Sequence, residues 1–172
     1  MVRAAKNSLA PINRIPSEVL SLILDHCEAD NQLVTLTHVC RRWREIFISY
    51  PSLWTCLDCA DFDKTRVYLE RSKASPLEIR FEETCPPPRH DAFQLTLLHT
   101  NRLKALSFSE PLPDINLSEY LTSPTPLLEK LEISVRGGHS DAVVGTLSDG
   151  DFRTLRELCL RGVITNLPWK TL

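Results

Sequence analysis

Cys56 and Cys59 are separated by two residues, which is the spacing of a zinc half-site or a redox pair. A structural zinc site needs four ligands, and neither a second C-x-x-C nor a paired histidine motif follows along the chain. The five histidines, at positions 26, 38, 90, 99 and 139, are scattered singly. We therefore interpret the two cysteines as buried structural thiols, and we expect no metal and no cofactor.

Motifs of phosphate-binding and nucleophilic enzymes do not occur in the sequence. Gly137 and Gly138 form a turn-like pair that is not followed by the lysine of a G-x-x-x-x-G-K-[ST] loop. No G-x-S-x-G context surrounds any serine. We expect that the protein is not an enzyme.

Arg41, Arg42 and Arg44 lie close together in VCRRWREIF, residues 39–47, which raises the possibility of nucleic-acid binding. Against this, the chain has 20 Lys and Arg residues and 22 Asp and Glu residues, a net charge of −2. On a helix, Trp43 and Phe47 fall on one side and the arginines mostly on the other. We interpret the arginines as a solvated face, expect no nucleic-acid partner, and expect reversal of Arg42 to Glu to have little effect on partner binding.

Apolar periodicity predicts three short helices before Pro51. In IPSEVLSLILDHC, from Ile15, apolar side chains recur at steps of three and four, and Pro16 suits a first helical turn. Leu33 and Leu36 begin a second apolar series, and Val39 begins a third that Pro51 ends. No stretch approaches the ~20 apolar residues of a membrane-spanning helix, so we expect no membrane partner.

A different pattern follows from residue 61, beginning with a short helix in KTRVYLERSKASP. A template L-x-x-L-x-L then recurs in ASPLEIRF, LKALSFS, LEKLEIS and LRELCLR. The second-leucine positions are Leu77, Leu106, Leu131 and Leu158, separated by 29, 25 and 27 residues. These spacings are typical of leucine-rich repeats, which bury their apolar faces by stacking.

The first of these regions resembles the F-box, and the whole layout resembles fungal proteins that join an F-box to leucine-rich repeats. The resemblance covers residues 15 to about 54, with Ile in place of the family's first Leu. The positions that carry it are Ile15, Pro16, Glu18, residues 19 to 24, Asp30, Leu33, Leu36, Val39, Cys40, Arg41, Arg42, Trp43, Leu53 and Trp54.

The resemblance implies an α+β fold in which a three-helix F-box is followed by a short leucine-rich-repeat α/β solenoid. We expect a disordered N-terminus over 1–13, the F-box over 14–60, and an incomplete repeat domain over 61–172. Residues 166–172, NLPWKTL, look like the approach to another strand, so we expect the solenoid to be open at its C-terminal end. Whether further repeats follow Leu172 stays open.

The resemblance also implies a function as the substrate-recruiting subunit of an SCF-type ubiquitin ligase, in the cytoplasm or the nucleus. The F-box would bind a Skp-type adaptor and, through it, a cullin. The alternative is a repeat scaffold without a ligase link. Apolar surface on a small helical domain favours a partner site, and the predicted adaptor-binding residues are Ile15, Pro16, Leu20, Ile23, Val39, Cys40 and Trp43.

The repeats would bind a protein substrate that the sequence does not identify. Side chains between the repeat leucines are expected on the open face of the sheet. The predicted substrate face consists of Glu78, Arg80, Ser107, Ser109, Glu132, Ser134 and Arg161, with Cys159 beside them.

Overall fold

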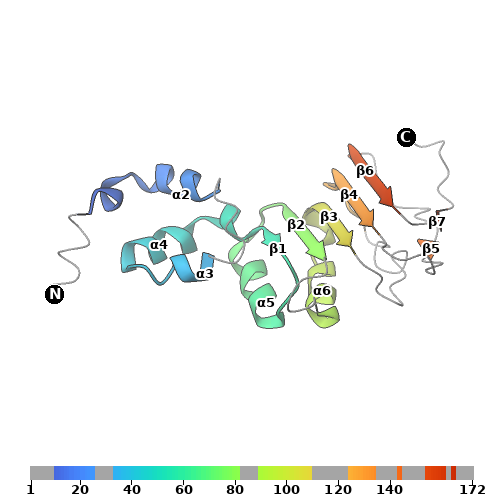
Figure 1. Ribbon diagram of the computed structural model, residues 1–172, viewed down its shortest axis with the longest axis horizontal. Coiled ribbons are helices and arrows are strands. Elements are labelled where there is room, and N and C mark those ends of the chain that lie inside the picture. The colour runs from blue at the N-terminus through green and yellow to red at the C-terminus, as the bar shows by residue number, and fades with distance from the viewer. Residues whose placement is uncertain are drawn as a thin grey trace.

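The computed structural model describes residues 10–25, 33–81, 89–109, 124–134, 143–144, 154–161 and 164–165. The described part of the chain is elongated, with short helices at one end and a parallel sheet at the other (Figure 1). Two further helices, α5 and α6, lie along one side of the sheet. The fold is therefore a mixture of helix and sheet with the helices first, as the sequence predicts.

The N-terminal part consists of short helical elements. They are η1 (Pro11–Arg14), α2 (Ser17–Asp25), α3 (Leu33–Leu36), α4 (Arg41–Ser49) and η2 (Pro51–Trp54). Cys40 separates α3 from α4 because its backbone is extended, with φ −158° and ψ 170°. Tyr50, which precedes Pro51, is extended and ends α4, because the residue before a proline disfavours helical geometry. Pro51 then opens η2. The three predicted helices are thus confirmed.

All five strands of the main sheet are parallel. They are β1 (Cys56–Leu57), β2 (Leu77–Phe81), β3 (Leu103–Ser109), β4 (Lys130–Ser134) and β6 (Glu157–Arg161), in the order β1-β2-β3-β4-β6. Helix α5 (Phe62–Arg71) connects β1 to β2, and α6 (His90–Leu97) lies between β2 and β3. A second, two-stranded parallel sheet pairs β5 (Val143–Val144) with β7 (Ile164–Thr165). The parallel sheet is compatible with stacked repeats, because parallel neighbours need a crossover connection between them.

The predicted repeats align in the sheet with one correction. Leu106, Leu131 and Leu158 pair across β3, β4 and β6 as predicted. In β2, however, Ile79 pairs with Leu106, whereas Leu77 pairs with Leu103. The buried residues Leu77 and Ile79 of β2 are two positions apart, but they face Leu103 and Leu106 of β3, which are three positions apart. The pairing therefore shifts after Leu77, and Lys104 is the extra residue in β3.

Aromatic side chains fill the space between the sheet and the helices beside it. Phe81 of β2 and Phe108 of β3 both pack against Phe93 of α6, with ring centroids 5.0 Å and 5.1 Å from that of Phe93. The two strand phenylalanines are 5.7 Å apart and all three are buried. This cluster fixes the helical side of the sheet, so the alternate side chains of each strand must point to the opposite, open face.

Helix α5 is held at both of its ends. Asp61 caps the start, accepting a hydrogen bond from the backbone of Lys64 at 2.7 Å. At the other end, the buried Arg102 donates to the carbonyl of Leu69 at 3.2 Å, to the hydroxyl of Ser72 at 3.0 Å and to the carbonyl of Lys73. Burial lowers the pKa of the Arg102 guanidinium, and the carbonyl oxygens at the helix terminus compensate part of that cost.

No helix in the described ranges combines the length and the apolar character needed to span a bilayer.

Candidate functional site

Helix α2 exposes a row of aliphatic side chains. Val19, Leu22 and Ile23 are between 45% and 58% exposed. Steps of three and four residues place them on one face of the helix. Leu20 and Ser21 lie on the opposite face and are buried. A helix that is apolar on both its inner and its outer face is typical of an element covered from both sides, and we call Val19, Leu22 and Ile23 the outer face of α2.

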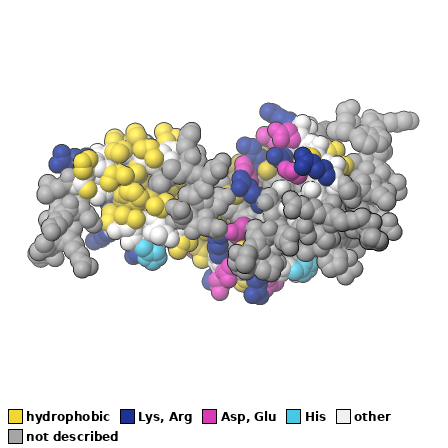
Figure 2. All heavy atoms as spheres, viewed as in Figure 1, with side chains coloured by type: hydrophobic (Ala, Val, Ile, Leu, Met, Phe, Trp, Pro, Cys, Tyr) yellow, Lys and Arg dark blue, Asp and Glu magenta, His cyan; other side chains and the backbone are white. Residues whose placement is uncertain are grey.

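Exposed hydrophobic side chains are found throughout the N-terminal helical region. Figure 2 shows hydrophobic side chains gathered over the N-terminal helices, whereas charged side chains are spread over the sheet end. Seven of the ten exposed large hydrophobic side chains among the described residues lie before residue 60. Exposed apolar surfaces of this kind are typical of interaction sites. The seven are Ile12, Val19, Leu22, Ile23, Val34, Val39 and Ile48.

Two of the predicted anchors, Leu20 and Trp43, lie inside the chain. Leu20 is 1% exposed and Trp43 is 8% exposed. The indole N–H of Trp43 donates to the side-chain oxygen of Asn13 at 2.8 Å, and its ring meets Phe47 edge to face at 5.5 Å. The expectation that these two side chains are left uncovered is wrong, because both complete the core of the helical region.

The other predicted anchors differ in exposure. Pro16, Ile23 and Val39 are exposed. Ile15 and Cys40 are half-buried and pack against the core. Adaptor binding by any of the seven residues stays a prediction, and the exposed ones are best placed to make it.

Sequence reasoning missed Val19 and Leu22 as candidate contacts. The available signal was the sequence SEVLSLILD, residues 17–25, in which five of nine side chains are large and aliphatic. A helix that buries one apolar face needs only about half of these five side chains for that face. The surplus on a short helix indicates a second apolar face.

The arginines of α4 differ in exposure. Arg41 and Arg44 are exposed, as predicted for a solvated face, whereas Arg42 is half-buried. Arg42 donates to the backbone carbonyls of Asn13 and Ile15, and so ties η1 to α4. Arg44 donates to the carbonyl of Thr37 at 3.1 Å. Arg41 forms an exposed pair with Glu45 at 2.9 Å.

The open face of the sheet collects all seven residues of the predicted substrate face. They form cross-strand rows, since Arg80 pairs with Ser107 and Ser107 with Glu132. Glu78 belongs to a neighbouring row, facing Ala105 and then Lys130, which is a consequence of the register shift in β2. Substrate binding by this set stays a prediction. The third row consists of Ser109, Ser134 and Arg161.

Charges on this face are mixed. The ammonium group of Lys130 lies 3.6 Å from a carboxylate oxygen of Glu132 and 3.6 Å from one of Glu157. These partly exposed pairs contribute little stability in water. The face can therefore form polar contacts with a partner at low cost in lost internal ion pairs.

Cys59 is buried and chemically protected. Burial raises the pKa of its thiol to about 12, the neighbouring Asp58 carboxylate adds to the rise, and Lys64 opposes it. Cys56 is half-buried on β1. Within the described ranges, no group of three or more His, Cys, Asp or Glu side chains is arranged to hold a metal ion.

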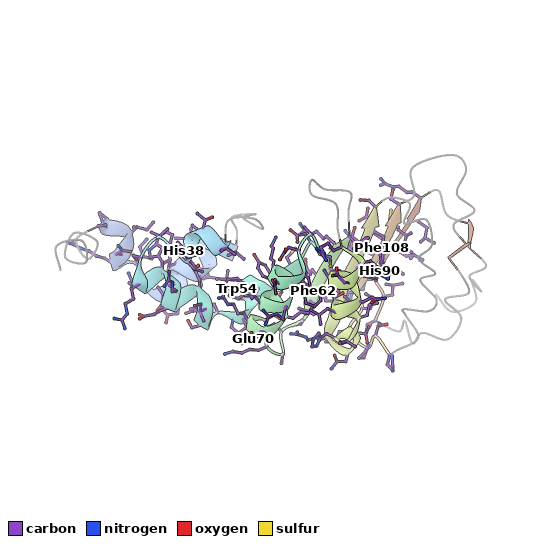
Figure 3. The ribbon with its side chains drawn as sticks, turned by 90° about the horizontal axis from the view of Figure 1, so that it is seen from below. His38, Trp54, Phe62, Glu70, His90 and Phe108 are labelled. Carbon is purple, nitrogen blue, oxygen red and sulfur yellow. The ribbon has the colours of Figure 1, made fainter. Side chains whose placement is uncertain are left out.

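Trp54 joins the helical region to the sheet domain. Its indole N–H donates to the carbonyl of Phe47 in α4 at 2.8 Å, and its ring meets Tyr68 of α5 edge to face at 5.0 Å. The guanidinium of Arg71 lies over the same ring at 4.3 Å. Figure 3 shows Trp54 between the helices marked by His38 and the helix that carries Phe62 and Glu70. Trp54 and its neighbour Leu53 in η2 are both buried.

The helical region also has a counterpart among known families. Residues 12–60 match the model of the F-box-like family. This match supports an F-box protein and covers η1 to β1, including the outer face of α2. Comparisons with curated proteins and with solved structures found no match.

Proposed function

We propose that the protein recruits substrates to an SCF-type ubiquitin ligase and performs no chemistry of its own. The observation that carries the proposal is the aliphatic outer face of α2 within a segment that matches the F-box-like family. F-box domains typically bind Skp-type adaptors, and an uncovered apolar helix face is suited to such an adaptor. The cullin would join through the adaptor, in the cytoplasm or the nucleus.

The sheet domain would hold the substrate. Its open face carries mixed charges and hydroxyl groups without a large exposed aromatic side chain among the described strands. Such a face favours a polar, specific contact over strong hydrophobic adhesion. Holding substrate and adaptor on one chain raises the effective concentration of the substrate at the ligase.

Capture of a purified Skp-type adaptor by the full chain tests this function. The wild-type chain is expected to retain the adaptor, and the double variant Leu22→Asp with Ile23→Asp is expected to lose it, because two carboxylates would be desolvated at the interface. Both side chains are exposed in the free chain, so the variant should melt at the wild-type temperature.

Leu98→Asp is the matched control, since Leu98 is 77% exposed and lies beyond the F-box-like segment. Its adaptor capture should equal that of the wild type. Absence of capture by the wild-type chain would favour a repeat scaffold without a ligase link. Equal capture by the double variant would move the interface away from α2.

A further inference from the structure

A groove lies between the F-box-like helices and α5. Its volume is about 560 Å³, which is within the range of ligand-binding clefts. Val34 of α3, Ile48 of α4 and Val67 of α5 line it, so all three helices contribute aliphatic walls. Val34 and Ile48 are both exposed and do not belong to the outer face of α2.

Positive charge surrounds these aliphatic walls. The groove is lined by three cationic side chains, Arg44, Lys64 and Arg71, and by one carboxylate, that of Asp63. Asp63 is already paired with Arg66 at 3.3 Å, and Lys64 with Asp58 at 2.5 Å.

Among the described residues, two guanidinium groups of the groove have no carboxylate partner. Arg44 contacts the carbonyl of Thr37 and a ring nitrogen of His38, and Arg71 contacts the ring of Trp54. In the part of the chain that the structure describes, neither arginine forms an ion pair. The net charge of the whole chain is −2, so this groove is a locally positive site on an acidic protein. Guanidinium groups bind carboxylates in a bidentate geometry, so the two arginines favour an anionic occupant. The aliphatic walls of the groove favour an occupant that also carries aliphatic side chains.

We propose that the groove between α3, α4 and α5 binds an acidic peptide segment of a partner protein, with aliphatic side chains against Val34 and Ile48 and carboxylates toward Arg44 and Arg71. This inference does not rest on adaptor binding, because the groove and the outer face of α2 use different side chains. The double variant Leu22→Asp with Ile23→Asp should therefore still bind the peptide.

Selection of a displayed library of random peptides on the full chain tests the proposal. The selected peptides should be enriched in Asp and Glu together with Leu, Ile, Val or Phe. Their affinity should fall by about tenfold or more in Ile48→Asp, which adds a repelling charge to the groove wall. Ile48→Lys should retain more affinity than Ile48→Asp, and the control Leu98→Asp should bind as the wild type does.

Arg44→Gln combined with Arg71→Gln provides a second test, because it removes the charge while leaving amide donors, and folding is checked by thermal melting. Its peptide affinity should fall and its salt dependence should weaken. Selected peptides without acidic enrichment, a library that yields no binder, or equal binding by Ile48→Asp and the wild type would each overturn the proposal.

Discussion

Trp43 and Trp54 are both buried and both form a hydrogen bond within the chain. Each indole N–H is satisfied internally, by Asn13 and by the carbonyl of Phe47 respectively. A buried tryptophan usually finds such a partner, because an unpaired N–H in the core is costly. Trp43, which the sequence favoured as an interface anchor, is therefore a core side chain in the free chain, as Trp54 is.

The buried thiol of Cys59 is expected to react slowly in the folded chain. A rise in its pKa from 9.0 to about 12 lowers the thiolate fraction near pH 8 by roughly a thousandfold, and only the thiolate reacts. Alkylation of Cys59 in the folded chain should be slower by about this factor than in the urea-unfolded chain, as measured by mass spectrometry of the peptide. Because the unfolded thiol ionises first, folding stability should also decrease as the pH rises above about 9. Equal labelling rates in both states would contradict the burial of this thiol.

At the scale of elements, η1 depends on α4. Arg42 donates to two carbonyls of the η1 region, Asn13 and Ile15, whereas Arg41 donates to Glu45 on its own helix. Arg42→Glu should therefore release η1, because the new carboxylate repels the same carbonyls. Amide hydrogen exchange over residues 10–16 should accelerate in this variant.

Arg41→Glu is the matched control for the release of η1. It changes the same charge on the same helix, and exchange over residues 10–16 should stay at the wild-type rate. Similar acceleration in both variants would assign the effect to net charge and not to the hydrogen bonds of Arg42.

Element positions could be predicted from the sequence far better than element contacts. Helical spacing and Pro51 predicted the helices, and recurring leucines predicted the rows of β3, β4 and β6. The two-residue strand β1 was missed, because a strand of that length has no periodicity. The role of Arg42 was missed as well, since its acceptors are backbone carbonyls, and every residue has one.

At the scale of the whole molecule, Trp54 couples the two regions. Truncation by Trp54→Ala should cost about 3–5 kcal/mol of unfolding free energy, because it leaves a cavity between α4 and α5. Trp54→Phe keeps a ring beside Tyr68 but loses the hydrogen bond to Phe47, and should cost about 1–3 kcal/mol. Urea titration followed by circular dichroism measures both values. A cost below about 0.5 kcal/mol for Trp54→Ala would show that the joint does not contribute to stability.

The arrangement of the molecule as a whole places the two proposed binding surfaces at separate ends. The aliphatic outer face of α2 lies in the helical region, and the polar open face belongs to the sheet (Figures 1 and 2). An adaptor and a substrate could thus bind together, with the Trp54 joint holding their relative position.

Hydrogen–deuterium exchange of the full chain, with and without a purified Skp-type adaptor, shows whether the adaptor binds the outer face of α2. We expect the adaptor to slow exchange in peptides covering residues 17–25, while peptides covering β3 and β4 keep their rates. Slower exchange confined to the sheet strands, or no change anywhere in the chain, would contradict this expectation.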